Sequence, residues 1–238
     1  MNIYPKEEKD YRKLARLGWR LGIPAIEAFL ELEVLDGDGR VVHSSRQRSH
    51  SWVRNTYNLL FCQAAVVENA TGSGLQLIDT GGVTRSGSGT QPASGWSSSG
   101  TGNQRIYVSS GYGLLAGSGI DTFGIIVGTG AGLESFENYA LASKIAAGNG
   151  AGQLAYSAME APLVTNEGTT KKATWARYFN NNSGALVMVN EVGICAFGTN
   201  DSSGLYMLLC RDLVSSGIGV PNTGQLKVTY IVQLTYPS

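Results

Sequence analysis

The chain has 238 residues, 18 basic and 18 acidic side chains, and only 15% charged residues. Its length allows a sizeable core, while zero net charge excludes an overall electrostatic basis for nucleic-acid binding. The 32 glycines are typical of a fold with many tight turns. Three cysteines without close spacing (Cys62, Cys195 and Cys210) predict free, buried thiols and a reducing compartment.

Neither export nor membrane insertion is expected from the sequence. Residues 1–13 are charged and lack the apolar core of a signal peptide. No apolar run approaches the roughly 20 residues that a membrane helix needs. We therefore expect a soluble protein that stays in the compartment where it is made.

Residues 1–25 form an expected N-terminal arm with a helix over 5–21. Pro5 suits the first helical position, and Gly22-Ile-Pro24 ends the pattern. Large apolar residues are few on this helix: Tyr11, Leu14, Leu17 and Leu21 form a narrow stripe, and Trp19 lies beside it. Two interpretations stay open. The helix docks on its own domain, or it packs on a neighbouring subunit, because the stripe is too narrow to bury well alone.

A hairpin and a second helix are expected next. Ala28–Val34 alternates like a strand, and Asp36-Gly-Asp-Gly39 supplies turn chemistry before a second strand at 40–43. A helix is predicted over 50–67, capped by Ser49 or Ser51. It is apolar nearly all round from Leu59, which predicts burial against the sheet or against a partner.

One basic cluster lies before this second helix. Arg46, Arg48 and Arg54 surround Trp52, and basic groups at a helix start oppose the helix dipole. An acidic partner would relieve this, either a patch on another subunit or a nucleic-acid backbone. The alternative is that these basic side chains are simply exposed to solvent at the start of the helix.

The rest of the chain predicts an antiparallel β-sandwich, jelly-roll-like, or a barrel, from about residue 105 to 236. The expected strands are short apolar runs between glycine and polar clusters: 104–108, 123–127, 135–141, 152–156, 186–195, 205–213 and 225–234. Residues 81–120 contain 11 glycines, nine serines and two charges, and are expected to form ordered loops rather than a linker. We expect a single β-rich domain over 26–238.

No catalytic, cofactor or metal site is predicted. Gly128-Thr-Gly-Ala-Gly132 follows an apolar strand, but its spacing fails the dinucleotide-binding pattern, so a turn that requires glycine is the better interpretation. His43 and His50 lie near no nucleophile elbow. Two groups of carboxylates are interpreted as solvated turn residues. Asp121, Glu134 and Glu137 lie near one another in sequence, and Asp201 and Asp212 flank the strand residues 205–210.

Several segments together resemble a loose group of bacteriophage virion proteins associated with tails, necks or fibres. The resemblance extends over residues 46–234, and the segments that carry it are Arg48–Asn55, Gly124–Gly130, Phe136–Leu141, Asn190–Ile194, Leu208–Asp212 and Leu226–Tyr230. It implies a self-assembling structural subunit and no catalytic residues.

We therefore expect a non-enzymatic virion subunit, assembled in the host cytoplasm. Its expected partners are copies of itself and other virion proteins, with no membrane and no main role for nucleic acid. The predicted subunit-interface residues are Tyr11, Leu14, Leu17, Trp19, Leu21, Arg46, Arg48, Trp52 and Arg54. The alternatives are a carbohydrate-binding β-sandwich module or adhesin, which would be a monomer or dimer that responds to glycans, and a β-fold glycosidase.

Overall fold

The computed structural model describes residues 5–65, 74–85, 94–95, 105–106, 113–200 and 203–237. The chain forms two compact units: unit 1 contains residues 1–50, 146–188 and 215–238, and unit 2 contains residues 51–145 and 189–214. Among these described residues the fold is mainly β, with antiparallel sheets and two helices, and its sheets are sandwich-like and open rather than closed into a barrel. The predicted fold class is confirmed. A single β-rich domain over 26–238 stays a prediction, because compactness alone does not decide whether the units fold independently.

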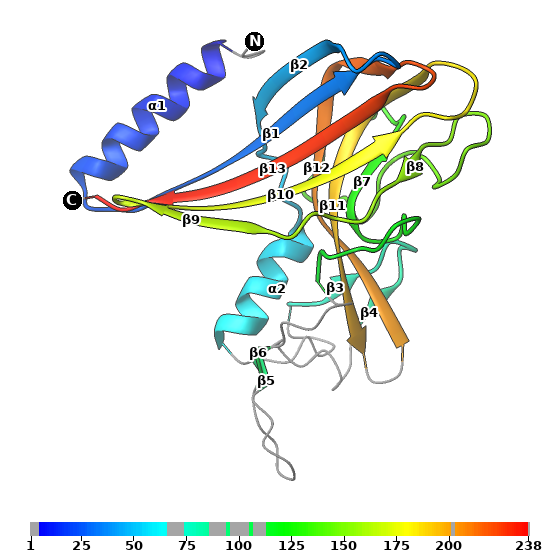
Figure 1. Cartoon of the computed structure of the whole chain (residues 1–238). Coiled ribbons are helices and arrows are strands. Elements are labelled where there is room, and N and C mark those ends of the chain that lie inside the picture. Colours follow the sequence, from blue (N-terminus) through cyan, green and yellow to red (C-terminus); the bar gives the residue numbers. More distant parts are fainter. Residues whose placement is uncertain are drawn as a thin grey trace. The chain divides into compact units, whose positions relative to one another are not determined.

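Unit 1 is built on one antiparallel sheet in the order β2-β1-β13-β10-β8, with β9 also paired to β10 (Figure 1). Its strands are β1 (Ala25–Leu35), β2 (Val41–Arg48), β8 (Ala155–Tyr156), β9 (Leu163–Glu167), β10 (Thr170–Asn180) and β13 (Gln225–Thr235). The first strand after the N-terminal helix thus pairs with the last strand of the chain, with Ala25 opposite Thr235.

Alternation of side chains gives this sheet two different faces. Leu30 and Leu32 of β1, and Val228 and Tyr230 of β13, are almost completely buried and form the core face. The residues between them point to the opposite side, which we call the open face. On the open face, residues of neighbouring strands lie side by side: Glu31 of β1 pairs with Arg46 of β2 and with Thr229 of β13.

The hairpin between β1 and β2 confirms the predicted turn. Asp36 Oδ1 accepts hydrogen bonds from the backbone N–H groups of Asp38 and Arg40, both at 2.9 Å. Gly39 has a φ of 78°, a conformation that glycine adopts without steric cost. The strands extend beyond the expected bounds, so Arg46 and Arg48 lie within β2 instead of in a loop before a helix.

Helix α1 (Pro5–Arg20) precedes the sheet and contacts β1. It begins at the expected proline, and Gly22 follows its end with a φ of 69°. The predicted helix over 5–21 is therefore confirmed within one residue.

Unit 2 contains helix α2 and a three-stranded sheet in the order β12-β11-β7 (Figure 1). Strand β7 is Gly124–Gly128, and α2 is Arg54–Ala65. Strands β11 (Val187–Asn200) and β12 (Ser203–Val220) each have residues in both units. Four two-residue strands form two further ladders: β3 (Leu77–Ile78) with β4 (Thr84–Arg85), and β5 (Ser94–Gly95) with β6 (Arg105–Ile106).

Two local predictions were wrong in unit 2. Helix α2 begins at Arg54, and Ser49 and Ser51 do not cap it, because the residues before it run extended along β12: Arg211 N donates to Ser51 O and Val53 N donates to Leu209 O, both at 3.1 Å. Residues 135–141 form a turn and loop instead of a strand.

Most of the glycine- and serine-rich stretch at 81–120 lies outside the described residues, including Trp96 and Tyr112. The predicted ordered loops there stay a prediction. Within the described part of the chain, no helix is long and apolar enough to cross a bilayer.

Candidate assembly surface

A cluster of charged side chains holds α1 to the sheet of unit 1. The guanidinium of Arg48 donates to Glu8 of α1 and to Glu27 of β1, each at 2.8 Å, and lies 4.3 Å from the centre of the Tyr11 ring. The Arg48 side chain is only 10% exposed. Its burial acts to lower its pKa, but the hydrogen bonds to Glu8 and Glu27 outweigh this and raise the pKa. We call Arg48, Glu8, Glu27 and Tyr11 the arginine clamp.

The clamp also acts on Glu8. The hydrogen bond from Arg48 holds the pKa of this carboxyl below its ordinary value, against the effect of burial, and Arg12 contributes further. Glu8 therefore stays ionised, and the link between helix and sheet is a charged one.

The inner side of α1 is polar or small. Glu8, Tyr11, Ala15 and Gly18 share one helical face and are half-buried. The predicted stripe of four residues was wrong for Tyr11, which lies on the inner side. Leu14, Leu17 and Leu21, which we call the leucine stripe, point away from unit 1 and are 63%, 49% and 63% exposed. Trp19 is 62% exposed. The structure therefore shows a docked helix that leaves its large apolar side chains uncovered.

Helix α2 is also anchored to its own unit by polar side chains. The buried amide of Asn55 donates to the carbonyl oxygens of Ile78 and Leu208, and Asn58 donates to Gln76 O at 2.7 Å. Leu59 packs on a core cluster. The other side carries exposed apolar residues: Tyr57, Leu60 and Phe61 are 43%, 59% and 55% exposed. One of the two predicted outcomes, that α2 buries its whole apolar surface within its own unit, is therefore wrong.

The exposed side of α2 continues into the loop at 133–139. The rings of Tyr57 and Phe136 lie 5.6 Å apart, and Arg54 N donates to Phe136 O at 2.8 Å. Phe136 is itself 47% exposed. We call Tyr57, Leu60, Phe61 and Phe136 the aromatic face of unit 2.

The remaining predicted interface residues fall into both units. Arg46 donates to Glu31 at 2.8 Å and stacks over Phe29 in unit 1. Arg54 forms an ion pair with Glu137 in unit 2. The acidic partners expected on another subunit are thus supplied by the chain itself. Trp52, also in unit 2, is half-buried and forms a β-bridge with Cys210.

A buried ion pair organises the glycine-rich loop after β7. Glu191 and Arg211 are 0% and 1% exposed, and Arg211 Nε donates to Glu191 Oε2 at 2.6 Å. The same carboxylate accepts backbone hydrogen bonds from Gly130 at 3.1 Å, Ala142 at 3.0 Å and Ser143 at 2.7 Å. Arg211 also donates to the carbonyl oxygens of residues 132 and 133.

This arrangement explains the Gly128-Thr-Gly-Ala-Gly132 motif. A Cβ at Gly128 or Gly130 would collide with the Glu191 carboxylate, whereas one at Gly132 would meet no atom within 4 Å. The loop therefore receives a carboxylate from its own chain, and the requirement for glycine predicted from the sequence is structural.

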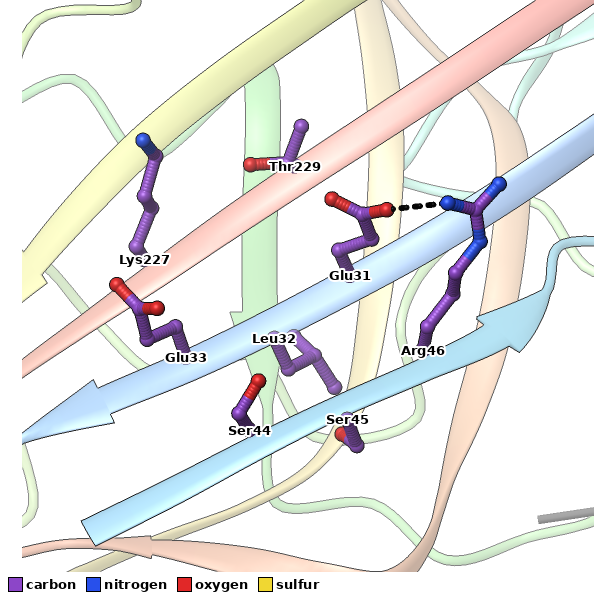
Figure 2. Close-up of a pocket in the computed structure, with 8 residues that line it drawn as sticks. All are labelled: Glu31, Leu32, Glu33, Ser44, Ser45, Arg46, Lys227 and Thr229. Carbon is purple, nitrogen blue, oxygen red and sulfur yellow. Dashed lines mark hydrogen bonds and ion pairs between the residues drawn. The ribbon is translucent and has the colours of Figure 1, made fainter. Parts of the chain in front are cut away.

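A shallow polar basin of about 340 Å³ lies on the open face of the unit 1 sheet (Figure 2). Figure 2 shows Glu31 and Glu33 of β1 between Arg46 of β2 and Lys227 of β13. A hydrogen bond to Tyr178 raises the pKa of Lys227, and Glu160 and Glu33 contribute to the same shift. The lining residues are Glu31, Leu32, Glu33, Ser44, Ser45, Arg46, Lys227 and Thr229.

The other candidate reactive groups have structural partners. Asp121 pairs with Lys144 at 2.8 Å, and Glu134 accepts from Leu213 N at 2.7 Å. Asp212 is buried and accepts from Cys210 Sγ, so its interpretation as a solvated turn residue was wrong. Asp201 lies outside the described residues. His43 bonds to Ser45, and the described residues contain no group of three or more potential metal ligands.

The two described cysteines are free and buried, as predicted. Burial raises the pKa of the Cys195 thiol to about 12, so this side chain stays protonated at neutral pH. The side chain of Cys62 lies outside the described residues.

Sequence reasoning missed three features of these surfaces: the clamp, the buried Glu191–Arg211 pair and the polar basin. Each joins residues that are far apart in the chain, such as Glu8 with Arg48 at 40 positions. A detectable signal existed only in the glutamates of β1, which recur at 27, 31 and 33 and share one face of the sheet. Comparison of the chain with protein-family models, curated proteins and solved structures yields no match.

Proposed function

We propose that this protein is a structural subunit that acts by self-assembly, as part of a bacteriophage particle in its tail, neck or fibre-attachment region. The assignment to a particle rests on the sequence resemblance described above. Assembly is supported by the physical arrangement of the two helices. The partners would be copies of the chain and other virion proteins, and the reaction chemistry of an enzyme has no part in it.

The observation that carries this proposal is that both helices are anchored by polar side chains and leave most of their described large apolar side chains exposed. Helix α1 is held by the arginine clamp, and α2 is anchored by Asn55 and Asn58. Surface helices of a monomer normally bury their apolar side. Exposed apolar surface of this kind marks an interaction site. The polar anchors set the orientation of each helix, and the uncovered leucines and aromatic rings are available to another molecule.

The experiment compares the oligomeric mass of the intact chain with that of Leu17→Asp by light scattering. Because Leu17 is 49% exposed, the substitution should leave the fold intact while it places a charge in the apolar stripe. We expect a multiple of 25.2 kDa for the intact chain and a smaller mass for the variant. Equal masses with equal circular-dichroism spectra would rule out α1 as an assembly element.

A second candidate function is favoured by the polar basin. A carbohydrate-binding module presents carboxylates, cations and hydroxyls in one shallow depression, because sugar hydroxyls both donate and accept hydrogen bonds. Glu33, Lys227, Ser44 and Thr229 provide such groups on the open face. Phe29 and Tyr178 on the same face are already occupied by Arg46 and Lys227, which limits ring stacking with a sugar. Assembly is therefore the better-supported function.

A glycan array followed by calorimetry on any positive glycan would test this second candidate. A binding module should lose its affinity in Lys227→Ala and keep it in Lys144→Ala, whose lysine pairs with Asp121 and does not line the basin. Binding that is equal in both variants would place the glycan elsewhere.

A further inference from the structure

We propose that the leucine stripe of α1 packs on the aromatic face of unit 2 in a neighbouring copy, so that the chains assemble head to tail. This inference rests on the proposed function and specifies its contact. The occupant of the aromatic face is α1 of a second copy, and each copy offers one stripe and one face.

The basic residues of α1 disfavour a contact between the α1 helices of two copies. Glu8 pairs with Arg12 and Asp10 pairs with Lys13. Within the described part of the chain, the cations that pair with acidic residues of α1 are Arg12, Lys13 and Arg48, and Lys9, Arg16 and Arg20 form no ion pair. Arg16 and Arg20 flank the exposed leucines, so two copies of α1 in contact would bring these cations together. Like charges brought together at an interface are unfavourable, and a partner without excess positive charge avoids this repulsion.

The aromatic face provides such a partner. Arg54 is the only charged residue of α2, and Glu137 neutralises it. The Glu137 side chain is 56% exposed, and it follows Phe136 at the edge of the face. A carboxylate has two oxygens and about four acceptor sites, so Glu137 can accept an arginine of the neighbouring α1 in addition to Arg54. Apolar side chains then meet apolar side chains, with opposite charges at the rim.

The geometry of this contact has a consequence for the assembly. Two different surfaces meet, so the contact is heterologous and leaves one free stripe and one free face at the ends of any short chain of subunits. Such contacts close into rings when the rotation between copies allows it and otherwise form filaments.

The test mixes two variants of the full chain that each lack one half of the contact. Leu17→Asp removes the stripe, and Leu60→Asp, at a residue 59% exposed, removes the aromatic face. Each variant alone should sediment as a single copy of 25.2 kDa, because neither retains both halves. An equimolar mixture should give a species of twice that mass, because the intact α1 of one variant binds the intact face of the other.

The alternative pairings give different results. If Leu60→Asp alone still assembles, α1 pairs with itself, which would overturn this inference and leave the proposed function standing. If Leu17→Asp alone still assembles, the contact joins two aromatic faces, which also overturns it. A mixture that stays at 25.2 kDa would overturn it as well. An intact chain that is always a single copy would contradict the proposed function itself.

A matched control is available in unit 1. Leu163→Asp changes a leucine of β9 that is 62% exposed and belongs to neither surface, so it should assemble like the intact chain. Thermal unfolding and circular dichroism of all three variants exclude misfolding as the cause of any loss of mass.

Discussion

Arg211 and Arg48 both form ion pairs with glutamates, and their surroundings give these two arginines different roles. Arg211 in unit 2 is 1% exposed, and its partner Glu191 is completely buried. Arg48 in unit 1 is 10% exposed, and its partners Glu8 and Glu27 are 18% and 21% exposed. The first pair lies inside a network of loop backbone groups, while the second joins a helix to the surface of a sheet.

The difference lies in what each pair would leave behind when broken. Removal of Arg211 would leave a buried carboxylate and two loop carbonyls without their charged donor. Loss of the arginine clamp would leave groups that water can reach. We therefore expect the buried pair to determine whether unit 2 folds, and the clamp to determine only where α1 lies.

The largest effect is expected for Arg211→Met. Breaking one side of a buried ion pair should lower the free energy of unfolding by about 3–5 kcal/mol. The matched substitution Arg46→Met breaks the exposed pair with Glu31 and should cost no more than about 1 kcal/mol. Chemical denaturation of both variants provides the comparison. Similar losses of unfolding free energy in the two variants would show that burial does not determine how much an ion pair contributes to stability.

A smaller effect is expected for Gly130→Ala. The added methyl group would collide with the Glu191 carboxylate and with Ala142, so unfolding should become easier by about 1–3 kcal/mol. Gly132→Ala in the same loop has open space around it and an ordinary φ, and should change stability by less than about 0.5 kcal/mol. Thermal melts should rank the variants in this order. Equal melting temperatures would mean that the loop tolerates a shift of the carboxylate.

Loss of the arginine clamp should have a local effect. Arg48→Ala is expected to weaken docking of α1 by about 1 kcal/mol, which corresponds to roughly fivefold faster trypsin cleavage within the helix. The melting temperature of the sheet should change little. Arg40→Ala, which breaks a pair that is mostly exposed on both sides, is the control and should leave cleavage unchanged. Cleavage of α1 that is equally slow in both variants would show that other contacts hold the helix.

The smallest effect is the pH dependence of the same contact. The pKa of Glu8 lies below its ordinary value of 4.5, chiefly because Arg48 donates to its carboxylate. Its contribution to docking is therefore complete above pH 4.5 and is lost as the pH falls through the lowered value. A nitroxide at Lys9→Cys, with Cys62→Ser, should become more mobile over this range. In Glu8→Gln its mobility should be high and should not change with pH; a pH response that persists there would assign it to another group.

Much of the fold could be predicted because its signals are local. The Asp36–Gly39 turn, the β1–β2 hairpin and the end of α1 at Gly22 follow from neighbouring residues. The division into two units could not be predicted, because β11 and β12 read as continuous strands while their residues are divided between the two units.

The orientation of the helices was the least predictable part of the candidate site. The pattern of α1 predicts one stripe of Tyr11, Leu14, Leu17 and Leu21, but Tyr11 lies on the docked side. The side that faces the sheet depends on Arg48, 40 residues beyond Glu8. In α2 the apolar composition predicts burial, whereas the side-chain amides of Asn55 and Asn58 satisfy backbone groups of distant segments and turn the helix. Polar contacts over long sequence separation thus decided which residues were left exposed.

Sedimentation velocity of the intact chain over a hundredfold range of concentration tests the central claim most directly. If the outward apolar sides of α1 and α2 are assembly surfaces, a discrete species with a mass that is a multiple of 25.2 kDa should appear and persist as the concentration rises. A single species of 25.2 kDa at every concentration would contradict the account, because the exposed leucines and aromatic rings would then serve no contact between copies of this chain.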